Sequence, residues 1–197
     1  MVDPEAEARW RALIREVPDF PQPGIRFRDI TPLLHDPAAL REVNDALAEA
    51  IRALRPTVVA GIEARGFIFG MPVAERLALP FVPVRKPGKL PAVYVSVAYE
   101  LEYGEAELQL HHNPSVEGQR VVVVDDLLAT GGTAEAAGRL VGALGGAVAG
   151  YAFCLELAAL GGAAGGAGDR ADSLLRSSGR RARGARAFPM ARCRAPA

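Results

Sequence analysis

The sequence predicts an α/β fold in which a central, mostly parallel sheet is flanked by helices. Short apolar segments alternate along the chain with segments of helical periodicity, which is the pattern of such folds. In the segment Arg120–Val124, four consecutive valines form a continuous apolar, β-branched run, as in parallel strands buried on both faces. Half of the 197 residues are hydrophobic, so the chain can form the core of a single domain.

In the N-terminal part of the chain, residues typical of helix caps and turns predict two helices and a strand between them. An Asp-Pro pair opens a helix that is predicted over Asp3–Glu16, because its apolar residues recur at helical spacing. Residues 20–30, FPQPGIRFRDI, combine a Pro/Gly turn with a short strand. A second Asp-Pro pair opens a helix that runs from Asp36 to about Leu54.

The centre of the chain alternates strands with helices. Strands are predicted at Thr57–Gly61, Phe81–Val84, Arg120–Val124 and Ala147–Leu157. Helices are predicted at Gly66–Leu79 and Thr133–Leu144. Pro72 is expected in the first turn of its helix, where a proline is tolerated. The loop RKPGKLPAV, residues 85–93, is expected to be mobile, and alternating segments predict an antiparallel arm at Tyr94–Tyr99 and Ala106–Leu110.

The predicted domain spans residues 1–162, and residues 163–197 form a tail of different character. After Asp169 the chain carries eight arginines against Asp172 alone. The tail is rich in Ala, Gly and Arg without usable periodicity, so it is predicted to be disordered. It is interpreted as an added arm for an anionic partner or as the product of a frame shift. The frame shift is favoured, and residues after about Gly162 should then pack poorly.

Composition limits the class of protein. The 23 basic and 23 acidic residues balance, so no nucleic-acid partner is expected. No segment approaches the roughly 18 apolar residues of a membrane span, and the acidic N-terminus has no apolar signal region. A cytoplasmic location without a membrane partner is therefore expected.

Cysteines and histidines predict no metal site. Cys154 and Cys193 belong to no CxxC pair, and Cys154 lies in an apolar run as a small buried hydrophobe does. His35, His111 and His112 match no metal-ligand or catalytic-triad pattern and are interpreted as surface residues.

Residues 121–133, VVVVDDLLATGGT, have the features of a phosphate-binding turn. Gly131 and Gly132 allow the backbone to approach an anion closely, and the first amides of the next helix are unpaired donors. The hydroxyls of Thr130 and Thr133 are further donors. This combination fits a phosphate group.

Two carboxylates stand between the valine strand and that turn. Asp125 and Asp126 emerge at the carboxyl end of the strand, where open α/β sheets bind their ligands. They would repel a phosphate but accept hydrogen bonds from neighbouring hydroxyls. A phosphate beside two adjacent hydroxyls describes a ribose 5-phosphate. The segment lacks the GxxxxGK[ST] and GxGxxG patterns, so P-loop hydrolases and dinucleotide-binding folds are disfavoured.

Residues 121–133 resemble the phosphoribosyl-pyrophosphate-binding motif of the type I phosphoribosyltransferases. Four more segments, in order along the chain, are similar to the adenine-specific branch of that family: VPDFPQPGIRFRDITPLL (17–34), EARGFIFG (63–70), VRKPGKLP (84–91) and LEYGEAEL (101–108). The resemblance covers about Trp10 to Leu160. It implies the type I phosphoribosyltransferase fold, with an N-terminal hood segment at residues 1–34 and a flexible antiparallel arm.

The resemblance also implies a reaction. Adenine and phosphoribosyl pyrophosphate, the expected small-molecule partners, would give AMP and pyrophosphate in purine salvage. Such a displacement passes through an oxocarbenium-like state and depends on positioning and charge stabilisation rather than on a covalent nucleophile. The family further implies Mg²⁺, held mainly through the substrate pyrophosphate, and a homodimer. The alternatives are a type I transferase for another purine base and a regulator that senses phosphoribosyl pyrophosphate.

The family's site residues carry over onto this sequence. The ribose 5-phosphate would be held by Asp125, Asp126, Ala129, Thr130, Gly131, Gly132 and Thr133. The pyrophosphate would be held by Arg65, Arg85, Lys86 and Lys89. Adenine would be held by Phe27 and Leu127 on its two faces, by backbone groups of Arg26 and by the side chain of Arg28. Catalysis is assigned to Glu102, as the residue that handles a proton, and to Arg65. Tyr103 would belong to a lid formed by the arm.

Two local features refine these roles. Arg65 is predicted at a helix start, where a cation is unfavourable unless an anion binds there. In the family, the loop that corresponds to EARG, residues 63–66, often carries a cis peptide, so one is expected at Glu63–Ala64. Many relatives have arginine where Pro87 stands, so one anion contact is expected to be missing from that loop.

Overall fold

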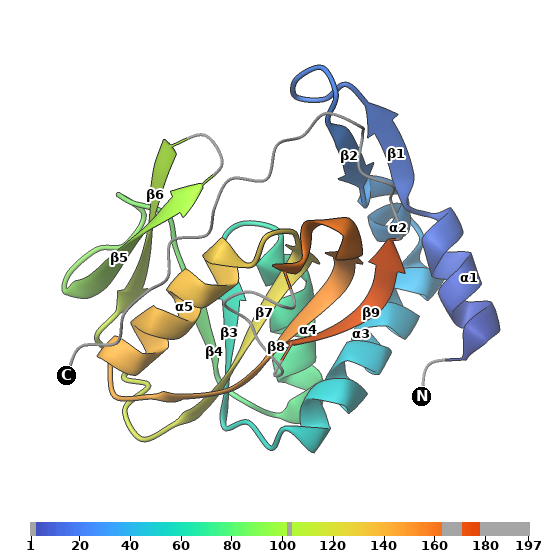
Figure 1. Ribbon diagram of the computed structural model, residues 1–197. Coiled ribbons are helices and arrows are strands. Elements are labelled where there is room, and N and C mark those ends of the chain that lie inside the picture. The colour runs from blue at the N-terminus through green and yellow to red at the C-terminus, as the bar shows by residue number, and fades with distance from the viewer. Residues whose placement is uncertain (1–2, 102–103, 163–170, 178–197) are drawn as a thin grey trace.

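The computed structural model describes residues 3–101, 104–162 and 171–177, and its centre is a five-stranded parallel sheet (Figure 1). The strand order is β4 (Phe81–Val84), β3 (Val58–Ile62), β7 (Arg120–Leu128), β8 (Ala147–Leu157) and β9 (Ala171–Ser177). Every neighbouring pair is parallel. The predicted α/β class is confirmed, and β7 continues past the predicted end of its strand, through the two aspartates.

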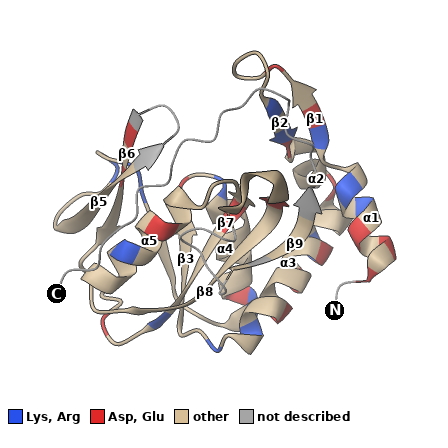
Figure 2. Cartoon of the chain, in the orientation of Figure 1, with Lys and Arg blue, Asp and Glu red and all other residues tan. Residues whose placement is uncertain are grey.

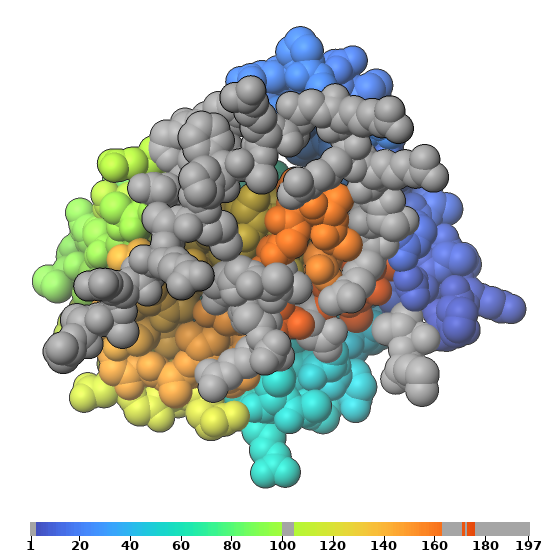
Figure 3. Space-filling view, viewed as in Figure 1, coloured from blue at the N-terminus to red at the C-terminus, as the bar shows by residue number. Residues whose placement is uncertain are grey.

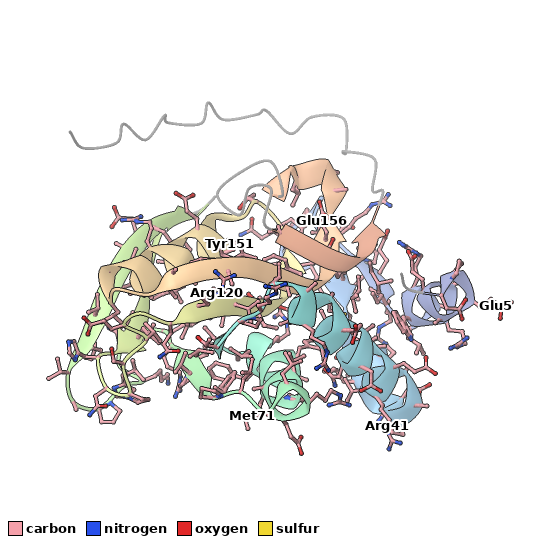
Figure 4. The ribbon with its side chains drawn as sticks, turned by 90° about the horizontal axis from the view of Figure 1, so that it is seen from below. Glu5, Arg41, Met71, Arg120, Tyr151 and Glu156 are labelled. Atoms are coloured by element: carbon pink, nitrogen blue, oxygen red, sulfur yellow. The ribbon has the colours of Figure 1, made fainter. Side chains whose placement is uncertain are left out.

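Helices cover both faces of this sheet (Figure 4). On one face lie α3 (Pro37–Ala53) and α4 (Gly66–Leu77), and on the other lies α5 (Gly132–Ala143). The valines of β7 alternate between the two cores: Val121 and Val123 pack with α5, whereas Val122 and Val124 pack with α3 and α4. All four valines are fully buried, as expected for a strand covered on both sides. In Figure 2 the strands of the sheet are correspondingly tan over most of their length, and the charged residues of β7 and β8 lie towards the strand ends.

The hood segment is built from α1 (Pro4–Ala12), β1 (Arg15–Pro18), β2 (Arg26–Asp29) and α2 (Thr31–His35). The prediction that the first helix continues to Glu16 is wrong, since the chain pairs as a strand from Arg15 onward. There β1 forms an antiparallel hairpin with β2, with Val17 opposite Phe27. A pairing between distant segments therefore overrides the helical spacing of the apolar residues.

Two strands, β5 (Tyr94–Leu101) and β6 (Gly104–His111), form the predicted antiparallel arm. Alternate residues of β5 pack against the core beside α5: Val95, Val97 and Tyr99. On β6, Leu108 and Leu110 are almost completely buried. The arm is thus anchored by one apolar face along most of its length.

Three further expectations are settled by the fold. Pro72 is the seventh residue of α4 and not part of its first turn, as predicted, because the helix continues through it. The expectation of poor packing after Gly162 is wrong for residues 171–177: β9 pairs with β8, and Leu175 is fully buried. The rest of the tail, which includes Cys193, lies outside the described residues. Cys154 is buried and free, as predicted.

Among the described residues, no helix is long and apolar enough to cross a membrane. In the same part of the chain, no group of three or more His, Cys, Asp or Glu side chains is placed to hold a metal ion.

Candidate active site

A pocket of about 210 Å³ opens at the carboxyl end of β7. It is lined by Arg65, Asp125, Asp126, Leu127, Leu128, Ala129, Thr130, Gly131, Thr133, Ala134 and Phe153. The structure therefore brings the two aspartates, most of the predicted phosphate turn and Arg65 into one concavity. Hairpin β1–β2 and the arm stand on either side of this end of the sheet (Figures 1 and 3).

The phosphate turn leads directly into α5. Gly131 is the N-terminal capping residue, with φ +90°, a conformation that side chains larger than glycine's rarely adopt. The helix start carries no side-chain cap, so its first amides remain available to an anion. Gly162 supports the turn from behind, because a Cβ at Gly162 would collide with the carbonyl oxygen of Ala129.

The two aspartates differ in their partners. Asp126 is buried, and its Oδ2 accepts a hydrogen bond from Arg65 Nε. Asp125 accepts a hydrogen bond through Oδ1 from the backbone N–H of Asp126, at 2.8 Å. Burial, followed by the neighbouring charge of Asp126, raises the pKa of Asp125 well above its ordinary value. A hydroxyl that donates to this carboxylate would relieve the unfavourable burial of its charge.

Arg65 has the environment of an anion-binding side chain. Burial by itself lowers the pKa of its guanidinium, but the hydrogen bond to Asp126 and the charges of both aspartates raise it overall. Its side chain keeps 49% of its accessible surface, so part of the guanidinium fork faces solvent at the pocket. The peptide bond Glu63–Ala64, just before it, is cis as predicted.

The start of α4 reaches the end of β7 only because Gly66 has no side chain. A Cβ there would lie 2.6 Å from the carbonyl oxygen of Val124 and 3.0 Å from Oδ1 of Asp125. This contact places Arg65 beside the aspartates. Sequence reasoning missed the role of Gly66, although its position directly after the arginine in EARG was a usable signal.

The predicted pyrophosphate residues of the next loop lie beside Glu63. Oε2 of Glu63 accepts hydrogen bonds from Arg85 Nε and from the backbone N–H of Lys86, each at 2.9 Å. The hydrogen bond from Arg85 holds the pKa of Glu63 below its ordinary value. The Arg85 guanidinium also lies 5.8 Å from the ring centre of Phe67. Lys86 and Lys89 are exposed.

The predicted adenine residues fall into two places. Leu127 lines the pocket, whereas Phe27 lies on β2 and packs edge-on against Phe20, with ring centres 5.2 Å apart. On the same hairpin, Glu16 forms ion pairs with both Arg26 and Arg28.

The assigned catalytic residue Glu102 and the lid residue Tyr103 lie outside the described residues.

Comparison with known proteins identifies the family. The family described as "Phosphoribosyl transferase domain" matches residues 29–167. The adenine phosphoribosyltransferase of Synechococcus sp. (strain RCC307) is 54% identical over 156 residues, which are 79% of this chain and 88% of that protein. The chain belongs to the adenine phosphoribosyltransferase family.

Solved structures agree with this assignment to the adenine phosphoribosyltransferases. The family member from Thermoanaerobacter pseudethanolicus superposes with a TM-score of 0.83 at 49% identity, over 86% of this chain and 99% of the other. The enzyme from Saccharomyces cerevisiae, solved with an imino-altritol bisphosphate and adenine, gives a TM-score of 0.81 at 36% identity, over 87% and 99% of the two chains. The predicted type I phosphoribosyltransferase fold is therefore confirmed, and the chain is a pentosyl-transferring enzyme of this family.

Proposed function

We propose that the chain transfers the phosphoribosyl group from phosphoribosyl pyrophosphate to adenine and releases AMP and pyrophosphate. The observation that carries this proposal is the pocket at the end of β7. There an uncapped helix start lies beside two aspartates and a half-exposed arginine. This combination offers donors to a phosphate, acceptors to ribose hydroxyls and a cation to a leaving pyrophosphate.

The ribose 5-phosphate is held by both kinds of group. The amides at the start of α5, with the hydroxyls of Thr130 and Thr133, bind the 5′-phosphate. Asp125 and Asp126 accept hydrogen bonds from the two ring hydroxyls. The anomeric carbon is thereby fixed relative to both the base and the leaving group, which is the main requirement for a displacement of this type.

The bond from the anomeric carbon to the pyrophosphate oxygen breaks as the bond to adenine N9 forms, and the N9 proton leaves. Arg65 stabilises the charge that develops on the pyrophosphate, with Arg85, Lys86 and Lys89 as further cations. Glu102 is proposed to handle the proton, and Tyr103 to belong to the lid that excludes water.

Magnesium fits this arrangement as a cation that arrives with the substrate. Mg²⁺ keeps several waters and binds through phosphate oxygens and one or two carboxylates. The adjacent carboxylates of Asp125 and Asp126 meet that requirement without a dedicated protein cage. When bound, the ion supplies charge neutralisation on the pyrophosphate.

Adenine is proposed to lie between Leu127 and Phe27. Leu127 already lines the pocket, and Phe27 belongs to the hairpin beside it. The pairing of Arg26 and Arg28 with Glu16 holds both side chains along the hairpin. A homodimer is part of the proposal, because the exposed lysines of the 85–93 loop suit a contact across two subunits. A cytoplasmic location is proposed as well.

The test is a panel of bases with the purified full chain. Adenine, guanine, hypoxanthine and xanthine are each supplied with phosphoribosyl pyrophosphate and Mg²⁺, and nucleotide formation is followed by chromatography. Turnover of adenine alone is the expected result. Turnover of another base at a higher rate would move the proposal to a different purine transferase. Binding of phosphoribosyl pyrophosphate without turnover of any base would favour a sensor.

A further inference from the structure

In the described part of the chain, a side-chain hydrogen bond joins the arm to the phosphate turn. Strand β5 lies along α5 (Figure 1), and Tyr99 is one of the residues on its packed face. The hydroxyl of Thr133 donates a hydrogen bond to the hydroxyl oxygen of Tyr99, at 3.4 Å. Six residues further along α5, Arg139 Nη1 donates to the carbonyl oxygen of Ala98, also at 3.4 Å. The second contact fixes the strand beside the helix.

The partner of Tyr99 is itself part of the phosphate turn. Thr133 is the second residue of α5 and lines the pocket. A hydroxyl can donate one hydrogen bond while it accepts another. Once the Thr133 hydroxyl donates to a phosphate oxygen, its lone pairs can accept a hydrogen bond from Tyr99. The phenol then fixes the rotamer of Thr133 and strengthens its donation, as connected hydrogen bonds do.

We propose that Tyr99 is a positioning residue for the 5′-phosphate, which acts on the substrate through Thr133. The inference rests on the proposed function, since it takes the Thr133 hydroxyl as a phosphate ligand. The ring of Tyr99 packs against the core, and its hydroxyl supplies the orientation. Tyr99 belongs to the arm, so the same contact links the place of the arm to the occupancy of the phosphate turn.

The test compares Tyr99→Phe with Tyr94→Phe. Tyr99→Phe removes only the hydroxyl and keeps the packed ring. Tyr94 lies on the same strand and is 42% exposed, so Tyr94→Phe is a matched control. One hydrogen bond corresponds to a change of about 3- to 10-fold. Tyr99→Phe is expected to raise the KM for phosphoribosyl pyrophosphate and the Kd for ribose 5-phosphate by this factor, whereas the KM for adenine and kcat change less than about 2-fold.

A double-mutant cycle separates positioning from general damage to the fold. In a Thr133→Val background, Tyr99→Phe is expected to have no further effect on the Kd for ribose 5-phosphate, measured by calorimetry. The inference is overturned if Tyr99→Phe leaves that Kd unchanged, or if its effect persists at full size in the Thr133→Val background. Absence of adenine turnover by the wild type would contradict the proposed function instead, and the calorimetric cycle still decides the role of Tyr99.

Discussion

Arg65, at the start of α4, donates a hydrogen bond through Nε to the buried carboxylate of Asp126, at the end of β7. The contact joins the proposed pyrophosphate site to the proposed ribose site. Because Asp126 is almost completely enclosed while Arg65 is half exposed, the carboxylate orients the guanidinium and leaves part of it free for an anion.

Arg65→Ala is expected to lower kcat/KM for phosphoribosyl pyrophosphate by at least about 100-fold, because a cation that faces the leaving group is lost. Stability is expected to fall by more than the about 1 kcal/mol of an exposed ion pair, because the buried carboxylate of Asp126 is left without its cation. Steady-state kinetics and urea unfolding measure the two effects. Arg52→Ala removes a charge from an exposed pair with Glu49 and serves as the control. An Arg65→Ala enzyme with kinetics like those of the control would contradict this role.

Gly66→Ala is expected to impair both stability and activity. Its Cβ would meet the carbonyl oxygen of Val124 at 2.6 Å, which is backbone and cannot rotate away. Overpacking of this kind costs about 1–3 kcal/mol and would move Arg65 away from Asp126. Gly142→Ala, in an open position on α5, is the matched control and should be neutral or stabilising by up to about 1 kcal/mol. Equal melting temperatures for the two variants would refute the close contact.

Asp125→Asn is expected to impair turnover without loss of stability at pH 8. Burial, and then the charge of Asp126, raises the pKa of Asp125 in the folded protein. Its charged form is thus less favourable in the folded chain than in the unfolded chain, so this group lowers stability as pH rises through the raised pKa.

The pH dependence of urea unfolding checks the sign of this effect. Above the ordinary aspartate value of 3.8, wild-type stability should carry a contribution that falls as pH rises, and Asp125→Asn should lack it. A variant that is less stable than the wild type at every pH from 5 to 8 would show that the charge of Asp125 stabilises the fold.

Phe27→Ala is expected to raise the KM for adenine by at least about 5-fold, because stacking on an aromatic ring is worth about 1–3 kcal/mol per base. The KM for phosphoribosyl pyrophosphate should change little, since the phosphate turn belongs to another element. Initial rates with each substrate varied in turn separate the two constants. A rise confined to phosphoribosyl pyrophosphate would place Phe27 outside the base site.

The parallel sheet and the phosphate turn could be predicted because their signals are local. Asp36 caps α3 through hydrogen bonds from the N–H groups of Ala38 and Ala39, each at 3.0 Å. The turn at 129–133 places glycine where φ is positive and a helix start where a phosphate must bind. Each of these features is readable within a few residues.

Other features depend on contacts between distant parts of the chain. The N-terminal helix ends at Ala12 because the chain pairs with β2 from Arg15 onward, and helical periodicity does not reveal this partner. Strand β9 forms within an unusual tail because β8 offers an edge and the core accepts Leu175. The contacts of Gly66 with Asp125 and of Tyr99 with Thr133 likewise join separate elements, so the sequence alone could not place them.

The most direct test of the central claim is AMP formation from adenine, phosphoribosyl pyrophosphate and Mg²⁺ by the wild type and by Asp125→Asn/Asp126→Asn. We expect the wild type to form AMP, and the double variant to remain folded while its kcat/KM for phosphoribosyl pyrophosphate falls by at least about 100-fold. A folded double variant that forms AMP at the wild-type rate would contradict the claim that these carboxylates hold the ribose.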